Sequence, residues 1–134
     1  MSRLILVNAS LGLALGALLI MFTPFMREFS SWHIGGEQLA LGAFIVGVLC
    51  FIAVTRTRTA VYSLLLITVL ASLIEATVIA LPAIINLVPN PVSYINFAEQ
   101  QVVLGCFVAG PFVLAGGVLG GLIRIALARR IDNR

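Results

Sequence analysis

The chain has 134 residues, of which 61% are hydrophobic and only 10% are charged, with a formal net charge of +3. A water-soluble domain of this length could not bury so much apolar surface. The basic residues do not indicate nucleic-acid binding, because they are dispersed and form no patch with interleaved aromatic side chains. The composition predicts one membrane domain, residues 1–134, with no length left for a soluble domain.

Four apolar stretches follow one another, and a helix needs about 20 such residues to cross a bilayer. They cover residues 4–23, 37–54, 60–81 and 97–128. Helix is expected because backbone groups in lipid must bond within their own segment, and no stretch alternates like a barrel strand. The last stretch is long enough to tilt or protrude. The first resembles a signal peptide but lacks a small-residue cleavage site, so we interpret it as a retained helix.

The arginines predict the orientation of these helices. Seven of them fall on one side of a four-span arrangement: Arg3, Arg56, Arg58, Arg124, Arg129, Arg130 and Arg134. The other side holds Arg27 together with Glu28, Glu37 and Glu99. By the positive-inside rule, both termini are expected to be cytoplasmic, with loops 24–36 and 82–97 outside. We expect the membrane to be the plasma membrane, which in a bacterium is the inner membrane. Glu37 and Glu99 are expected in the first turns of their helices, where negative charge is favourable.

The two halves of the chain also resemble each other. Glu37-Gln38 and the block 41–47 recur as Glu99-Gln100 and the block 104–110, with one residue inserted. Each copy contains a helix, a proline, an external loop, this block and then arginines. The pattern predicts an all-α fold of four transmembrane helices arranged as two parallel-repeat helical hairpins, about 1–58 and about 59–134.

A family resemblance rests on the same residues. The glycine-bearing segment 11–16, the corner Thr23-Pro24-Phe25 and the block 41–47 resemble the SPW-repeat family of small bacterial membrane proteins. Thr23-Pro24-Phe25 replaces the Ser-Pro-Trp signature, and Leu81-Pro82-Ala83 replaces it in the second copy. The family has no established activity, so the resemblance implies only the two-hairpin architecture.

Glu75 is the most informative single residue. It lies about 22 Å along the third helix from Ala60, and a charge at such depth costs about 2–3 kcal/mol even on insertion scales. Thr68, Ser72 and Glu75 follow one another at i, i+4 and i+7, on one helix face. The carboxyl either handles protons or substrate, or it is a protonated group bonded to a neighbouring helix or subunit. The second interpretation is favoured because no other span offers an ionisable partner at that depth.

Glycines at four-residue spacing predict close helix packing, because two backbones can approach where side chains are missing. Such pairs occur at Gly12 and Gly16, Gly116 and Gly120, and Gly117 and Gly121. Pro111 is expected to bend the fourth helix.

The first loop has the pattern of a short amphipathic helix at the membrane surface. Phe25, Phe29 and Trp32 recur on one face and would anchor it at the headgroups. His33 beside them is a weak candidate cofactor ligand, more simply a boundary histidine. Cys50 and Cys106 lie inside apolar stretches without metal-site spacing and are interpreted as packing thiols.

Three functional classes follow from these residues. The favoured one is a non-catalytic accessory subunit of a larger membrane complex of respiratory or photosynthetic type, with other membrane subunits and lipid as partners and no cofactor or metal. The alternative is a small transporter or channel, oligomeric, with Glu75 in the pathway. The third, a membrane enzyme or quinone-binding protein using His33 or Glu75, ranks last.

Overall fold

A computed structural model describes residues 1–23, 33–85 and 89–133, with only the backbone of Pro82 and Ala83. The described residues form four helices: α1 (Ser2–Phe22), α3 (Gly36–Ala53), α4 (Thr57–Ile84) and α5 (Pro91–Asp132). All four are long and apolar enough to cross a membrane. The predicted all-helical, four-span fold is therefore confirmed, and the chain has the character of a multi-pass membrane protein.

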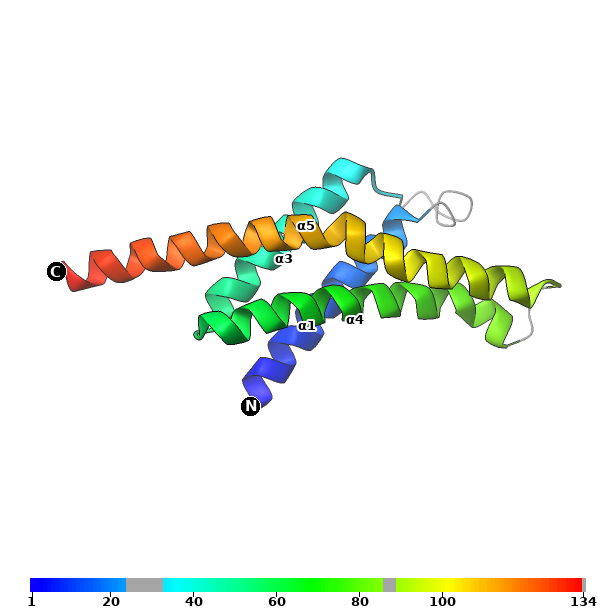
Figure 1. Cartoon of the computed structure of the whole chain (residues 1–134), viewed down its shortest axis with the longest axis horizontal. Helices are drawn as coiled ribbons and strands as arrows, with labels where there is room; N and C mark the ends of the chain where they lie inside the picture. Colours follow the sequence, from blue (N-terminus) through cyan, green and yellow to red (C-terminus); the bar gives the residue numbers. More distant parts are fainter. Residues whose placement is uncertain (24–32, 86–88, 134) are drawn as a thin grey trace.

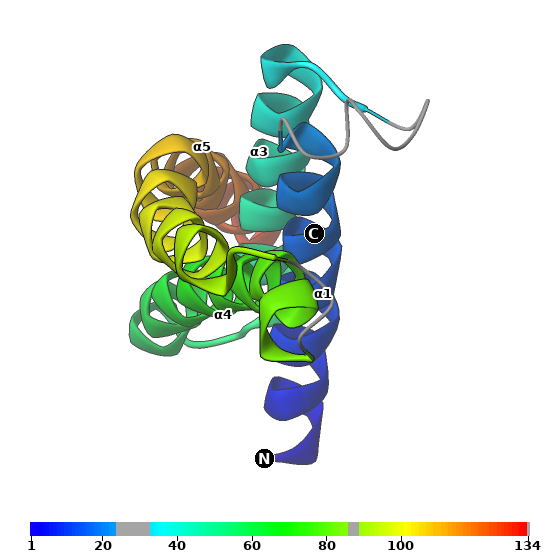
Figure 2. The same ribbon diagram turned by 90° about the vertical axis from the view of Figure 1, so that its right-hand side faces the viewer.

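The helices form two antiparallel hairpins, α1 with α3 and α4 with α5 (Figure 1). The hairpins cross, since α1 and α3 run along the vertical of Figure 2 while α4 and α5 are seen nearly end-on. In that view α1 and α5 lie on opposite sides, and the main contacts join α5 to α3 and α4, and α1 to α4 and α3. The division into two sequence repeats stays a prediction.

Helix length matches this crossing. The 21 residues of α1 and the 18 of α3 are close to the number that spans a bilayer upright. The 28 residues of α4 and the 42 of α5 give rods of about 42 and 63 Å, against a hydrocarbon core of about 30 Å. Because the hairpins cross, they cannot both lie parallel to the membrane normal. The longer helices, α4 and α5, can tilt further from the normal and still span the bilayer, or can protrude from it.

The core lies where the helices meet and is built from small and branched side chains. Leu15, Ala43, Ile67, Ala71 and Val113 are completely buried. Large apolar side chains also cover the outside of all four helices, and Leu13 and Phe107 are 60% and 78% exposed. A surface of this kind is stable in lipid but would associate in water.

Several helix ends differ from the predicted ones. Backbone helix continues through Pro82 to Ile84, and α5 passes through Pro111 without interruption. The helix α5 begins at Pro91, because proline suits the first helical position, where its missing N–H is not needed. The expectation that Glu99 lies in a first turn is therefore wrong, whereas Glu37 does lie in the first turn of α3.

Candidate functional site

Glu75 lies on α4 and points into the contact with α5. Its side chain is 2% exposed. The helix α5 leaves room for it at Gly105, where an added Cβ atom would lie 3.1 Å from Glu75 Oε2 and 2.8 Å from Ser72 Oγ. The predicted face of α4 thus meets a glycine of α5, at a position that the sequence did not single out for packing. The repeat block contained Gly105, but only a structure pairs it with Glu75.

The polar groups beside Glu75 are already engaged. Thr68 Oγ1 donates to the carbonyl oxygen of Leu64 at 2.9 Å, and Ser72 Oγ donates to that of Thr68 at 3.0 Å. Cys106 of α5 donates its thiol to Ser72 Oγ at 3.5 Å. Both hydroxyl groups therefore donate their hydrogen bonds to backbone carbonyl oxygens of α4, as serine and threonine side chains commonly do inside an apolar helix.

One carboxyl oxygen of Glu75 is left over. Among the described residues, Oε2 is buried and has no hydrogen-bond partner. A buried carboxylate needs hydrogen-bond donors or a cation, and its nearest polar neighbours offer neither. The arrangement can therefore hold an uncharged carboxyl, or accept a hydrogen bond from a group brought by a ligand, a water molecule or another subunit.

A cavity of about 240 Å³ lies beside this cluster, between α4 and α5. Thr68 and Cys106 line it, so the hydrogen-bonded chain that reaches Ser72 begins at its wall. Gly110 and Pro111 also line the α5 side of the cavity, where the missing side chain of the glycine leaves space. The remaining wall is apolar.

The predicted packing glycines lie at two different interfaces. On α5, a Cβ atom on Gly116 would overlap the carbonyl oxygen of Phe44 in α3, and one on Gly120 would lie 2.8 Å from that of Val48. Gly117 faces the side chains of Leu64 and Phe51, and Gly121 makes only ordinary contact with Phe51.

Gly12 and Gly16 of α1 instead face side chains of α4. Added Cβ atoms there would lie 2.7 Å from Leu70 and 3.2 Å from Ile74. The α3–α5 contact is thus backbone against backbone, and the α1–α4 contact is backbone against side chain. The first kind of contact tolerates no added atom, because a backbone carbonyl cannot turn aside.

Three further residues have roles in helix packing that were not predicted from the sequence. Gly47 of α3 lies against the backbone of α5 at Val113 and Gly117. Arg124, interpreted only as a topology signal, donates to the carbonyl oxygen of Val54 at 2.7 Å and to Thr57 Oγ1 at 3.0 Å. It thereby joins α5 to the end of α3 and the start of α4.

The third missed residue is Asn8, which is 9% exposed and whose Oδ1 has no partner among the described residues. It lies one turn before Gly12 on α1. Its signal in the sequence is a single asparagine within an apolar helix, four residues before Gly12.

The remaining candidates lie apart from Glu75. Phe25, Phe29 and Trp32, the predicted surface anchor, lie outside the described residues. His33 precedes α3 and is half-buried. Cys50 and Cys106 are free thiols, and the described part of the chain holds no group of three His, Cys, Asp or Glu residues that could bind a metal ion.

Comparison of the chain with protein-family models, curated proteins and solved structures finds no match. The resemblance to the SPW-repeat family therefore rests on the sequence motifs alone. The function has to be argued from the surfaces of this molecule.

Proposed function

We propose that the protein is a non-catalytic accessory subunit of a larger complex in the bacterial inner membrane, and that it binds a partner subunit through the last turns of α5. Both termini are cytoplasmic in this proposal. The arginine-bearing ends support that orientation: the start of α1, the α3–α4 connection and the end of α5 carry all the arginines of the described residues.

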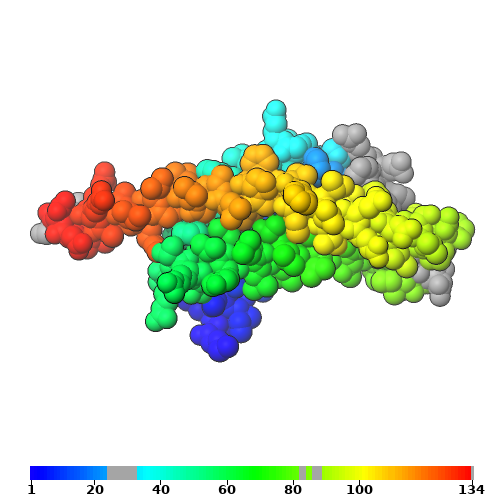
Figure 3. Space-filling model, in the orientation of Figure 1, coloured from blue at the N-terminus to red at the C-terminus, as the bar shows by residue number. Residues whose placement is uncertain are grey.

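The observation that carries the proposal is the exposed end of α5. Every residue from 125 to 133 is exposed, although the helix continues to Asp132. Figure 3 shows this end projecting beyond the other helices. Arg124 hydrogen-bonds to the end of α3 and the start of α4, and every described residue after it is exposed, so about two turns of helix extend beyond the bundle.

The projecting segment has an apolar stripe. Ile123, Leu127 and Ile131 follow one another at four-residue spacing and share one face, and the last two are 54% and 75% exposed. Arg129 and Asp132 lie off this stripe, and Arg130, seven residues after Ile123, flanks it. A short helix without tertiary contacts is marginal in water, and helices bind grooves of partners through apolar residues at this spacing. A second protein seated on the stripe would supply the missing packing.

The test is purification of the tagged chain from its own membranes in a mild detergent, followed by native electrophoresis. We expect migration with a complex much larger than 14.3 kDa, containing defined partners in fixed stoichiometry. Leu127→Ser with Ile131→Ser should release the chain from that complex. The matched control, Ala126→Ser with Ala128→Ser, changes flanking exposed positions and should not. A discrete homo-oligomer that all four substitutions leave unchanged would overturn the proposal.

A second candidate function, a small oligomeric transporter or channel, is favoured by one observation. The cavity lined by Thr68 and Cys106 lies against the cluster in which Glu75 Oε2 is unpartnered. In that case a polar species would reach the carboxyl from the cavity. Proton or cation flux into liposomes containing the purified chain, abolished by Glu75→Gln and retained by Glu99→Gln, would establish it. Equal flux from both variants, or none from the unmodified chain, would exclude it.

A further inference from the structure

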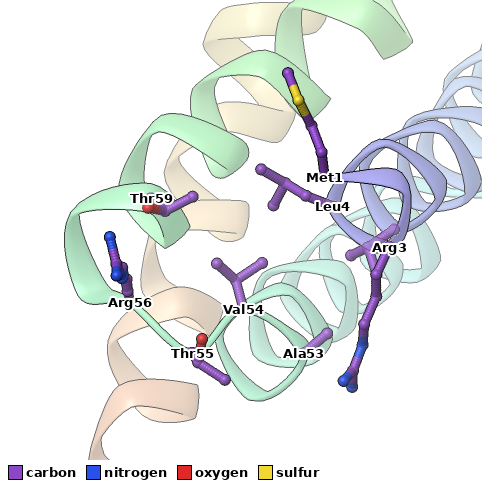
Figure 4. Close-up of a pocket in the computed structure, with 9 residues that line it drawn as sticks. Met1, Arg3, Leu4, Ala53, Val54, Thr55, Arg56 and Thr59 are labelled. Atoms are coloured by element: carbon purple, nitrogen blue, oxygen red, sulfur yellow. The ribbon is translucent and has the colours of Figure 1, made fainter.

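A second cavity lies at the arginine-bearing end of the molecule, beside the first two turns of α1. Its volume is about 420 Å³, within the range of about 300–1,000 Å³ of small-ligand sites. Figure 4 shows its walls: Met1 and Leu4 from α1, Val54 and Thr55 from the end of α3, and Thr59 from α4. The cavity is therefore enclosed by the start of α1 and by the short α3–α4 connection with its flanking residues, which are distant from α1 in sequence.

The cavity has basic residues at two sides and no acidic one. Arg3 and Arg56 flank it on opposite sides (Figure 4), and both are exposed. The acidic residues of the described part of the chain, Glu37, Glu75, Glu99 and Asp132, do not line it. Arginine binds phosphate through several N–H groups in a fixed geometry, so this charge distribution suits a phosphate group.

An apolar groove of about 410 Å³ continues from this cavity between α1 and α3. Arg3, Val7 and Ala53 line both spaces, which makes them neighbours. The groove then follows Leu11 and Leu49 away from the arginines, in the direction of the helix axes. A free phosphate ion has no apolar surface to place in such a groove, whereas an acyl chain would bury apolar surface there.

We infer that the cavity and the groove together bind one anionic phospholipid. Its phosphate lies between Arg3 and Arg56, and one acyl chain follows the groove between α1 and α3. Basic pockets between transmembrane helices on the cytoplasmic side bind anionic headgroups in this way. The site does not depend on the partner subunit proposed for α5, because no residue beyond Thr59 lines either space.

The test is a titration of the purified full-length chain with dioleoyl-phosphatidylglycerol or dioleoyl-phosphatidylcholine, read by native mass spectrometry. The two lipids share their acyl chains and their phosphodiester group, and phosphatidylcholine adds a choline cation, so a difference in binding reports the net charge of the headgroup. One basic residue near a headgroup contributes about 1 kcal/mol, so Arg3→Gln or Arg56→Gln should each weaken phosphatidylglycerol binding about fivefold and the pair about 25-fold. Phosphatidylcholine binding should change little.

Two controls separate this site from general surface charge. Arg129→Gln with Arg130→Gln removes the same charge at the projecting end of α5, which does not line the cavity, and should leave phosphatidylglycerol binding within about twofold. Ser10→Phe, at a residue that lines the groove but not the cavity, narrows the groove without changing charge and should weaken binding of the lipid but not of soluble glycerol phosphate. Circular dichroism and gel filtration of each variant confirm that it is folded.

Three outcomes would overturn the inference. Equal binding of the two lipids would show that the site does not recognise the negative charge of the headgroup. An equal loss with the α5 arginine pair would assign the effect to net charge. Unchanged lipid binding in Ser10→Phe, together with glycerol phosphate binding as tight as that of the lipid, would leave a phosphate site without an acyl groove. Each outcome is obtained on the isolated chain, so a missing partner complex cannot produce it.

Discussion

The helix α5 packs against its two neighbours in opposite ways. Toward α3 it presents Gly116 and Gly120, and the two backbones touch with no side chain between them. Toward α4 it presents Gly105 and Cys106 to a buried polar cluster that contains an unpartnered carboxyl oxygen. Gly116 and Gly120 bring two backbones together, whereas Gly105 makes room for the carboxyl group of Glu75. The α3 side is therefore expected to determine stability, and the α4 side to be free for function.

The largest effect is expected at Gly116. A methyl group there overlaps the carbonyl oxygen of Phe44, and a backbone atom can yield only if the helices separate. Gly116→Ala should lower the free energy of unfolding by more than about 2 kcal/mol. The matched control is Gly121→Ala, where the added atom meets Phe51 at 3.4 Å, an ordinary contact, and the change should stay within about 0.5 kcal/mol.

Unfolding of the two variants in mixed detergent micelles, followed by circular dichroism, measures this difference. Equal stability of Gly116→Ala and Gly121→Ala would show that α3 and α5 are not in backbone contact. The stability ranking of the two sides of α5 would then be wrong.

The sequence predicts the four helices but not most of the contacts that distinguish the two sides of α5. Hydrophobic length alone located four spans, because the requirement for helix in lipid leaves little choice. The repeat, however, equates Gly47 with Gly110, and the two lie in different surroundings. A Cβ atom added at Gly47 would overlap the backbone of α5, whereas one added at Gly110 would lie 3.9 Å from Thr68 Cγ2. Equivalent sequence positions thus differ in contact because each helix has different neighbours.

The candidate site was predicted only in part for the same reason. Spacing placed Thr68, Ser72 and Glu75 on one face, since helix periodicity is local. Which helix that face meets is a tertiary property, so Gly105 and Cys106 could not be assigned. Arg124 was missed because a basic residue near a helix end has a sufficient explanation in topology, which conceals a specific bond.

The next largest effect is expected at Arg124, which lies at the arginine-bearing end of the α3–α5 contact. It donates to the carbonyl oxygen of Val54 at 2.7 Å and to Thr57 Oγ1 at 3.0 Å. Bonds from charged donors contribute about 1.5–3 kcal/mol, so Arg124→Gln should lower the free energy of unfolding by an amount in that range. Arg130→Gln, on the exposed end of α5, removes the same charge and should cost less than about 0.5 kcal/mol. Equal costs would mean that Arg124 acts only through net charge.

The smallest effect is expected at Glu75, and its size decides what the carboxyl is for. If the group is uncharged and lacks a cationic partner, Glu75→Gln preserves its shape and should change the free energy of unfolding by less than about 1 kcal/mol. If it were half of a buried ion pair, the loss would be about 3–5 kcal/mol. Glu99→Gln, at an exposed position of α5, supplies the reference for a surface carboxyl. A small stability change at Glu75 combined with a loss of complex assembly or ion flux would assign this side of α5 to function, because a residue that contributes little to folding yet is buried at a cost is retained for another reason. A large change with neither loss would instead make the carboxyl a structural group, and the contrast between the two sides of α5 would disappear.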